Sequence, residues 1–257
     1  MDLKKKVEQC LPVLGTHVHL SDTCITEIFA SFGYDFIWVD MEHTTLSTEQ
    51  VRTHILAAKA HGTPVIVRVP VDDLTNTKRI LETNVDGIVF PMVKSYEDAK
   101  RLIDNTLYPP YGTRGCGPKG AVRFGFDDEP TYYKEGHLKI CRFVQIEQES
   151  AVRDAERIAS IPYLDGCVLG MHDLSGSIGR LGDVFCEENV ALAKKAIEAF
   201  KRAGKTVGVS TCATDEETLT RYRDMGINLI TAGADYDYIL KGARSTLAMQ
   251  QKVWRVE

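Results

Sequence analysis

Eight short runs rich in β-branched and aromatic residues recur along the chain, separated by segments with helical periodicity. This rhythm constrains the fold more than any other feature. Several runs, such as Val65–Val67 and Ile88–Phe90, are apolar at consecutive positions, as expected of strands that are covered on both faces. The expected strands are Leu11–Val18, Phe36–Asp40, Val65–Val69, Gly87–Pro91, Arg142–Glu147, Gly166–Gly170, Thr206–Ser210 and Asn228–Gly233. Strands that alternate with helices predict a parallel sheet.

The segments between the strands carry the start and stop signals of helices. Residues 47–50, Ser-Thr-Glu-Gln, form a capping box, and Ser95 can cap another helix. Gly62 and Gly204 stand where helices should end, and Asn84 tolerates the left-handed conformation of such an end. The first strand is not followed by a glycine-rich dinucleotide fingerprint. We therefore predict an α/β fold, a (β/α)8 TIM barrel, as a single domain over residues 1–257.

One long irregular segment, about residues 106–140, interrupts the rhythm. Loops of this length in a compact domain are usually functional, so we interpret the segment as an active-site loop or lid. Its Arg114 either turns inward or points toward a neighbouring subunit, and its Cys116 is a candidate contact for substrate. The stretch 112–120 superficially resembles a phosphate loop, but Pro118 stands where the lysine should be. Nucleotide binding is not expected.

Composition excludes several classes of protein. The chain has 257 residues, of which 44% are hydrophobic and 26% charged, which is typical of a globular protein. Its formal net charge of −5 gives no basic footprint for nucleic acid. No apolar stretch approaches the roughly 20 residues of a membrane helix, and no secretion signal is visible. The seven cysteines are odd in number and never spaced Cys-x-x-Cys, so we expect a cytoplasmic protein with structural cysteines.

In such a barrel the reacting groups stand at the carboxyl ends of the strands. The sequence places carboxylates, an arginine and histidines there. The polar positions at these ends are Asp40, Glu42, His43, Arg68, Gln145, Glu147, His172 and Asp173.

Each of these residues has a functional and a purely structural interpretation. Glu147 and Asp173 can give a divalent cation two oxygen ligands, or each can merely cap the following helix. His43, three residues after Asp40, is a candidate general base or an ordinary loop histidine. Arg68, in an apolar strand, either neutralises a substrate anion or pairs with Glu147.

Two further histidines lie on the first expected strand. His17 and His19 alternate along it and should face the same side. With Glu42 and His43 they suggest a second metal site, which we weight below the pair of carboxylates because no His-Glu-x-x-His pattern is present.

Taken together and in order, these segments resemble the HpcH/HpaI aldolase family, the metal-dependent aldolases that form or cleave hydroxy-keto acids with pyruvate as one product. The resemblance covers nearly the whole chain. It rests on Gly33-Tyr34-Asp35-Phe36, Asp40-Met41-Glu42-His43, Val67-Arg68-Val69-Pro70, Phe90-Pro91-Met92-Val93, Tyr108-Pro109-Pro110 with Arg114-Gly115, Gln145-Ile146-Glu147, and Gly170 with Asp173-Leu174-Ser175.

The resemblance implies a TIM barrel assembled as a homo-oligomer, a trimer or hexamer, with active sites near subunit interfaces. It assigns Glu147 and Asp173 to a divalent cation, Mg²⁺ or Mn²⁺, with Co²⁺ or Zn²⁺ as further options. His43 and Asp40 become the catalytic base pair, and Arg68 stabilises the enolate of pyruvate at the metal. The substrate lies near Arg68, Gln145 and the segment of Gly170, Met171 and His172.

The sequence departs from the family's pattern at two places near the substrate. The family commonly has proline and a small residue before the metal-binding aspartate, and here Met171 and His172 stand there. Gly15-Thr16-His17 replaces a frequent Gly-x-Trp, which leaves the aldehyde partner open.

Three hypotheses for function follow. The leading one is a class II pyruvate aldolase, a carbon–carbon lyase that reversibly cleaves a 4-hydroxy-2-keto acid to pyruvate and an aldehyde. The second is a citrate-lyase-like or malyl-thioester lyase, which should offer a basic cleft for coenzyme A, and no basic cluster is found. The third is a barrel that binds a keto acid without turning it over.

Overall fold

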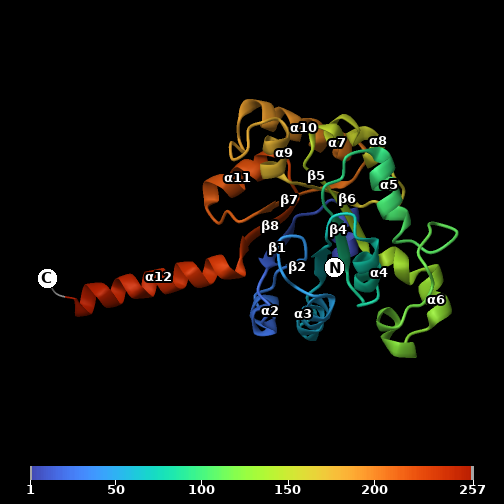
Figure 1. Ribbon diagram of the computed structural model, residues 1–257, viewed down its shortest axis with the longest axis horizontal. Helices are drawn as coiled ribbons and strands as arrows, with labels where there is room; N and C mark the ends of the chain where they lie inside the picture. The colour runs from blue at the N-terminus through green and yellow to red at the C-terminus, as the bar shows by residue number, and fades with distance from the viewer. Residues whose placement is uncertain (1, 256–257) are drawn as a thin grey trace.

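The computed structural model describes residues 2–255 and shows eight parallel strands that close into a barrel in the order of the chain (Figure 1). All eight expected strands are confirmed, with ends that shift by at most two residues. The strands are β1 (Val13–Val18), β2 (Phe36–Asp40), β3 (Val65–Arg68), β4 (Gly87–Phe90), β5 (Cys141–Ile146), β6 (Gly166–Leu169), β7 (Thr206–Thr211) and β8 (Leu229–Ala234). The predicted (β/α)8 TIM barrel is therefore confirmed.

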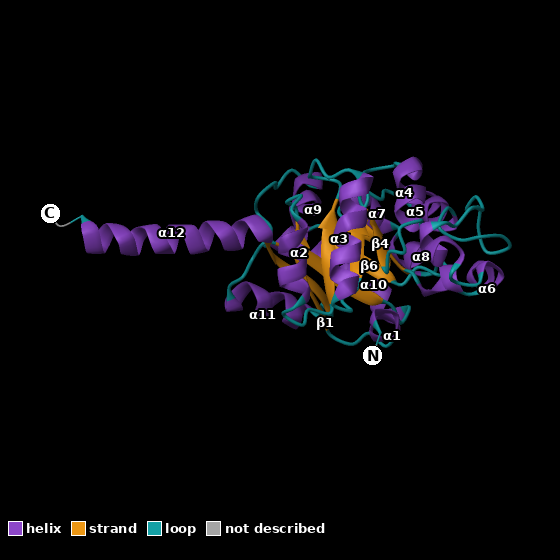
Figure 2. Ribbon diagram, turned by 90° about the horizontal axis from the view of Figure 1, so that it is seen from below, coloured by secondary structure: helices purple, strands orange, loops and turns teal. Residues whose placement is uncertain are grey.

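Helices surround the barrel (Figure 2). They are α1 (Leu3–Glu8), α2 (Thr23–Ala30), α3 (Thr48–Ala60), α4 (Leu74–Leu81), α5 (Tyr96–Asp104), α6 (Glu129–Lys134), α7 (Glu149–Arg153), α8 (Ala155–Ala159), α9 (Met171–Ser177), α10 (Glu187–Arg202), α11 (Glu216–Met225) and α12 (Asp235–Trp254). The expected capping box begins α3, where the Ser47 side chain accepts from the Gln50 N–H and Gln50 accepts from the Ser47 N–H. Ser95 caps α5 by accepting from the Asp98 N–H.

Two apolar cores hold the barrel together. The inner core fills the barrel, and α1 closes its amino-terminal end by burying Leu3 and Val7 against strand residues such as Trp38 and Phe143. The outer core lies between the strands and the surrounding helices. Since apolar side chains fill the amino-terminal part of the barrel, the polar side chains of the strands lie at the carboxyl-terminal ends.

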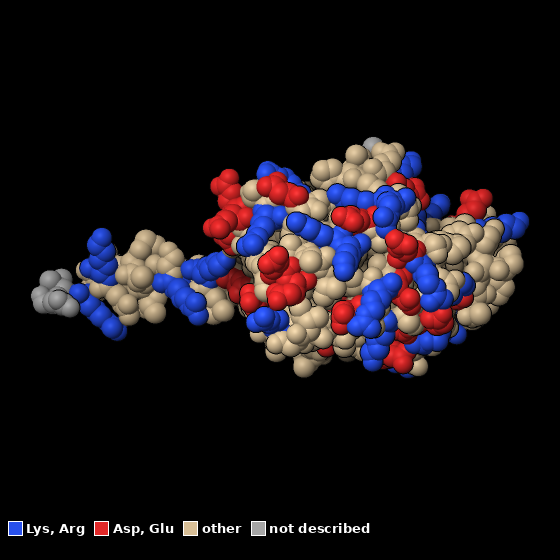
Figure 3. All heavy atoms as spheres, turned by 90° about the horizontal axis from the view of Figure 1, so that it is seen from above, with Lys and Arg blue, Asp and Glu red and all other residues tan. Residues whose placement is uncertain are grey.

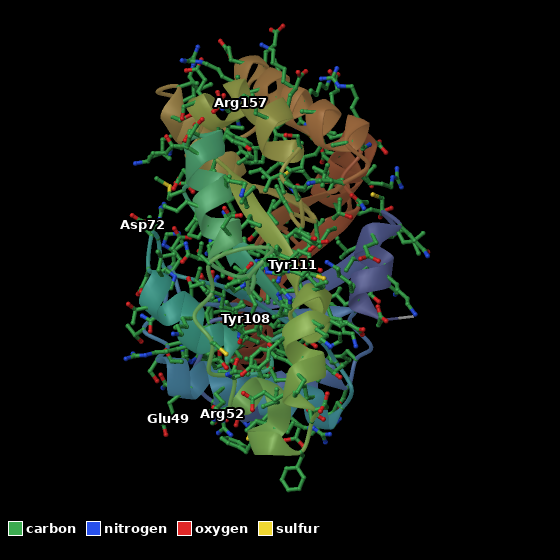
Figure 4. The ribbon with its side chains drawn as sticks, turned by 90° about the vertical axis from the view of Figure 1, so that its right-hand side faces the viewer. Glu49, Arg52, Asp72, Tyr108, Tyr111 and Arg157 are labelled. Atoms are coloured by element: carbon green, nitrogen blue, oxygen red, sulfur yellow. The ribbon has the colours of Figure 1, made fainter. Side chains whose placement is uncertain are left out.

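The long insertion lies between α5 and β5 and carries α6 and two short 3₁₀ helices, η1 (Gly120–Gly125) and η2 (Gly136–Lys139). Arg114 is buried in it and donates to the Glu82 carboxylate and the Leu81 carbonyl oxygen, at the end of α4. Figure 4 views the side of the molecule that carries the insertion and labels Tyr108 and Tyr111 near the middle. Both rings pack on His137. The insertion thus packs toward the amino-terminal ends of β4 and β5.

Helix α12 leaves the barrel and extends away from it (Figures 1 and 2). Of its 20 residues only Asp235 is buried, and large apolar side chains such as Leu247 and Trp254 are exposed. Acidic and basic residues are mixed over the barrel, whereas α12 carries only basic charges beyond Asp237 (Figure 3).

Among residues 2–255, no helix is long and apolar enough to cross a membrane. The seven cysteines are all free. Cys141 and Cys167 are buried among apolar neighbours, as expected of structural cysteines, but Cys10, Cys24, Cys116 and Cys212 are exposed, so the interpretation is wrong for these four.

Candidate active site

A cavity of about 600 Å³ opens at the carboxyl-terminal end of the barrel. Seven of the eight strands or the segments that directly follow them contribute to its wall. Residues that the sequence analysis singled out line it, namely His17, His19, Asp40, His43, Arg68, Gln145, Gly170, Met171, His172 and Asp173.

The centre of the site is an ion pair between Asp40 and Arg68. The parallel register of β2 and β3 places these two residues side by side at the ends of their strands. Arg68 donates from Nε to one carboxylate oxygen at 2.9 Å and from Nη2 to the other at 2.6 Å. Burial would raise the pKa of Asp40, but the hydrogen bonds and charge of Arg68 hold it below its usual value. Asp40 is thus a fixed anion that orients the guanidinium.

Arg68 also binds the next groups of the site. Its Nη1 lies 3.0 Å from Glu42 Oε2 and donates to Gln145 Oε1 at 3.3 Å. The amide of Gln145 in turn donates to Glu147 Oε2 at 2.8 Å. The predicted direct pairing of Arg68 with Glu147 is not what the structure shows, because Gln145 stands between them. One hydrogen-bonded row therefore joins β2, β3 and the end of β5.

The carboxylate of Glu147 is buried and is held on both sides. Met92, whose φ of 56° lies in the left-handed region, turns its N–H to Glu147 Oε1. On the other side Gly170 leaves room, since a Cβ at that position would stand 2.3 Å from Glu147 Oε2. A side chain in the left-handed region is strained, and such strain is commonly kept where it positions a functional group.

The electrostatics of this corner fit a bound cation. Burial raises the pKa of Glu147 to about 7, and the nearby charges of Glu42 and Asp173 add to the rise against the Met92 N–H. Burial also raises the pKa of Glu42. Glu147 thus lies near the carboxylates of Glu42 and Asp173, and the nearby Arg68 is itself paired with Asp40. Two carboxylates that leave positions open for water and substrate are the ligands that Mg²⁺ and Mn²⁺ accept, so the residues present fit a divalent cation.

The predicted pairing of His43 with Asp40 does not form within this chain. The side chain of His43 is 64% exposed at the rim of the cavity, and its Nε2 lies 3.6 Å from Glu42 Oε2. His19 is the histidine beside Asp40, with its two ring nitrogens 3.6 Å from Asp40 Oδ2 and 3.7 Å from Asp235 Oδ1. The Asp40 carboxylate is already engaged by Arg68, which leaves His43 to the next carboxylate along the chain.

His17 on β1 and His19 directly after it face the same side, as expected, with ring centroids 5.6 Å apart. His17 is buried between the Gly233 carbonyl oxygen and the Ser210 hydroxyl. Within residues 2–255 no group of three or more His, Cys, Asp or Glu side chains is arranged to hold a metal ion. The suggestion of a second metal site at these histidines therefore gains no support.

The remaining predicted substrate contacts divide into two groups. Gly170 caps α9, and Met171 and His172 begin it, all on the wall of the cavity. Cys116, in contrast, is exposed on the insertion and does not line the cavity of its own chain. No residue of the insertion lines this cavity, so the expected role as an active-site loop is not seen within this chain.

Sequence reasoning gave no role to two residues that the structure brings into the site. Ser210 on β7 lines the cavity against His17, and Asp235 accepts from the N–H groups of His19 and Leu20. Ser210 ended an expected strand, so the rule that strand ends carry reacting groups could have identified it. Asp235 follows the last strand, and no local pattern distinguishes it.

Fold and site together define a barrel enzyme with an arginine and a cluster of carboxylates at its mouth. The family model described as "HpcH/HpaI aldolase/citrate lyase" matches residues 14–241. A hydroxypyruvate/pyruvate aldolase of Roseovarius nubinhibens is 29% identical, over 95% of this chain and 93% of that one. A 4-hydroxy-2-oxo-heptane-1,7-dioate aldolase of Shigella sonnei is 28% identical, over 92% of this chain and 90% of its own.

A crystal structure of an HpcH/HpaI aldolase/citrate lyase family protein from Burkholderia cenocepacia superposes with a TM-score of 0.90. It is 30% identical, and the match covers 97% of this chain and 98% of that one. The chain therefore belongs to the HpcH/HpaI aldolase/citrate lyase family. It is an enzyme of the aldolase type, a carbon–carbon lyase.

Proposed function

We propose that this chain is a metal-dependent pyruvate aldolase that reversibly cleaves a 4-hydroxy-2-keto acid to pyruvate and an aldehyde. The observation that carries the proposal is the buried Glu147, whose carboxylate lies near those of Glu42 and Asp173. Glu147 is buried whereas Asp173 is exposed on the cavity wall, and a buried carboxylate beside other carboxylates is costly without a cation. The names of the two aldolases reported above support the same class of substrate.

A divalent cation held by Glu147 and Asp173 would polarise the keto group of pyruvate and offset the negative charge that develops on it. Other residues of the chain bind and orient the substrate. Arg68, fixed by Asp40, presents a permanent positive charge to the keto acid and orients it. Gln145 links Arg68 to Glu147 and keeps the two groups in register.

We assign the proton transfer to His43. Cleavage requires a base to take the proton from the hydroxyl on the carbon that becomes the aldehyde, and condensation returns it. His43 stands at the rim of the cavity with most of its ring exposed, whereas His19 is held between two carboxylates. His43→Ala should slow cleavage by about 10²- to 10⁴-fold. His61→Ala is the matched control, since His61 ends α3 and pairs with Glu27 away from the cavity.

The first test follows the methyl protons of pyruvate in D₂O by NMR, with Mg²⁺ or Mn²⁺ and again with a chelator. Exchange that requires the metal supports enolisation at the proposed site, and no knowledge of the aldehyde is needed. The Glu147→Gln variant should lose the exchange. Glu149→Gln should keep it, because Glu149 lies two residues further on and pairs with Arg153 at the surface.

Two results would count against this proposal. Full exchange in Glu147→Gln would remove the metal assignment. Binding of pyruvate without exchange, with every metal tried, would instead favour the barrel that binds a keto acid without turning it over.

A lyase that acts on a coenzyme A thioester is the second candidate, and the cavity disfavours it. A coenzyme A tail needs cations near its phosphates. Arg68 is the only Lys or Arg among the described residues that line the cavity, and it is paired with Asp40 and Glu42. The free cysteines fit the cytoplasm as the place of action.

We also propose that the chain acts as a homo-oligomer, a trimer or hexamer, and that α12 is part of the contact. A helix gains most of its stability from packing, and α12 has almost none within its own chain. The exposed Ile28 and Phe32 lie in and just after α2, next to β1, the strand that pairs with β8. They offer α12 of another copy an apolar surface.

Light scattering tests the assembly. The native chain should have three or six times its 28.7 kDa mass, and Leu247→Glu should lower that mass. Gln250→Glu serves as a control, because it makes the same change of charge at an exposed position of the same helix without removing an apolar side chain. A monomeric native chain would contradict the proposal. Contact between copies would also be needed for Cys116 to reach a cavity.

A further inference from the structure

His17 and Ser210 form a polar pair on the wall of the cavity, contributed by β1 and β7. The carboxylate ligands proposed for the cation, Glu147 and Asp173, follow β5 and lie on the helix that follows β6. None of the steps assigned above to the keto acid uses His17 or Ser210. This part of the cavity is therefore free to face the second substrate.

The hydrogen bonds of His17 determine which atom carries its proton. Its Nδ1 lies 2.7 Å from the Gly233 carbonyl oxygen, and because that oxygen can only accept, Nδ1 must donate. Burial lowers the pKa of His17 to about 4, so the ring is neutral at ordinary pH. Its Nε2 then has no proton and accepts.

The direction of the next hydrogen bond follows from this tautomer. Ser210 Oγ lies 2.8 Å from His17 Nε2, and the serine must supply the proton. The Ser210 O–H is thereby engaged as a donor to His17, while the lone pairs on its oxygen can still accept a hydrogen bond. Ser210 is partly exposed and lines the cavity. It therefore faces a substrate as a hydrogen-bond acceptor.

The charges of the cavity narrow the choice of ligand. Of the described residues on its wall only Arg68 is a Lys or Arg, and the proposed function assigns its charge to the keto acid. A carboxylate on the aldehyde would meet the lone pairs of the Ser210 oxygen, and no second Lys or Arg among the described wall residues would offset its charge. A hydroxyl group would donate to that oxygen.

We propose that Ser210, oriented by His17, is a specificity residue that binds a hydroxyl group of the aldehyde. The preferred partner is a 2-hydroxyaldehyde, rather than an unsubstituted aldehyde or one that carries a carboxylate. This inference rests on the proposed aldolase function and names the second substrate's class.

Three two-carbon aldehydes test the proposal, since they differ only in the group at C2: glycolaldehyde, acetaldehyde and glyoxylate. Each is condensed with pyruvate in the presence of Mn²⁺, and kcat/KM is measured for the native protein and for Ser210→Ala. The native protein should prefer glycolaldehyde. In Ser210→Ala its kcat/KM should fall by about tenfold, the worth of one hydrogen bond, while that for acetaldehyde is unchanged.

Further variants separate recognition from structural damage. Ser160→Ala makes the same change at an exposed serine that bonds only to the Arg157 carbonyl oxygen, and it should alter neither rate. Ser210→Thr keeps the acceptor and should restore the preference. His17→Phe frees the Ser210 hydroxyl to donate, so the ratio of kcat/KM for glyoxylate to that for glycolaldehyde should rise.

The outcomes distinguish this proposal from the function on which it rests. Native protein that exchanges pyruvate protons, with equal ratios of glycolaldehyde to acetaldehyde in native and Ser210→Ala protein, overturns the role of Ser210 alone. Native protein without any metal-dependent exchange overturns both the function and the role.

Discussion

Removing Arg68 should destabilise the protein much more than removing an arginine from a surface ion pair. Asp40 is completely buried, and Arg68→Met would take away both of its charged hydrogen bonds while roughly keeping the side-chain volume. Breaking a buried pair from one side costs about 3–5 kcal/mol, because the other charge is left in a medium of low polarity. We expect the free energy of unfolding to fall by about 4 kcal/mol at pH 7.

The sign of the pH dependence is set by Asp40. In the native protein Arg68 holds the pKa of Asp40 low, and the stability this contributes is present above the ordinary carboxyl range and lost only as pH falls through it. In Arg68→Met, burial is opposed only by the Glu42 N–H and by nearby His19, so the pKa of Asp40 should rise. The cost of the variant should therefore shrink as pH is lowered from 7 toward 4, because Asp40 takes up a proton.

Urea unfolding followed by circular dichroism, at pH 7 and pH 5, measures both effects. Arg157→Met is the matched control, since Arg157 makes a 2.6 Å ion pair with Glu97 at the surface and should cost little. The double variant Arg68→Met with Asp40→Asn removes the stranded charge and should recover much of the loss. A single variant as stable as the control, or a double variant no better than the single, would refute the reasoning.

Three further predictions concern the cation and the buried histidine. Gly170→Ala should displace Glu147, because the new Cβ would stand 2.3 Å from its Oε2, and should weaken Mn²⁺ binding in calorimetry, whereas Gly242→Ala, with nothing within 4 Å, should not. Glu147→Ala and Asp173→Ala should each lower Mn²⁺ affinity by more than about 100-fold and abolish pyruvate exchange, and undiminished binding in either would contradict the ligand assignment. Lowering the pH from 6.5 to 4 should reduce the free energy of unfolding by up to about 3 kcal/mol through His17. The reason is that His17 binds a proton in the unfolded chain over this range, whereas in the folded protein its pKa of about 4 keeps the ring largely neutral. In His17→Asn the free energy of unfolding should therefore depend less on pH over this range.

The regular parts of the fold were predictable because each signal is local. Apolar runs and caps identified all eight strands and helix starts such as Ser47 and Ser95, since periodicity and capping depend on neighbours in the chain. The course of α12 was not predictable in this way. Its sequence is that of an ordinary helix, and only the packing of the complete barrel shows that it stands clear.

The residues of the site were easier to predict than their partners. The rule that reacting groups stand at strand ends identified Asp40, Arg68, Gln145 and Glu147, because all strands of a parallel barrel end on the same side. Which of them pair depends on the register between β2 and β3, which joins Asp40 to Arg68 and leaves His43 against another carboxylate. Register depends on how two strands pair, so the sequence of either strand alone does not determine it.

The cavity separates the tasks of catalysis and selection between two kinds of polar group. In the proposed function, Glu147 and Asp173 hold the cation, so this part of the site acts only when one is bound. Around His17 it builds a neutral chain of hydrogen bonds, from the Gly233 carbonyl oxygen to Ser210, whose direction is fixed by the protein alone. Loss of the cation should therefore stop turnover without altering which groups Ser210 accepts. A change at Ser210 should alter the choice of aldehyde without altering the exchange of pyruvate protons.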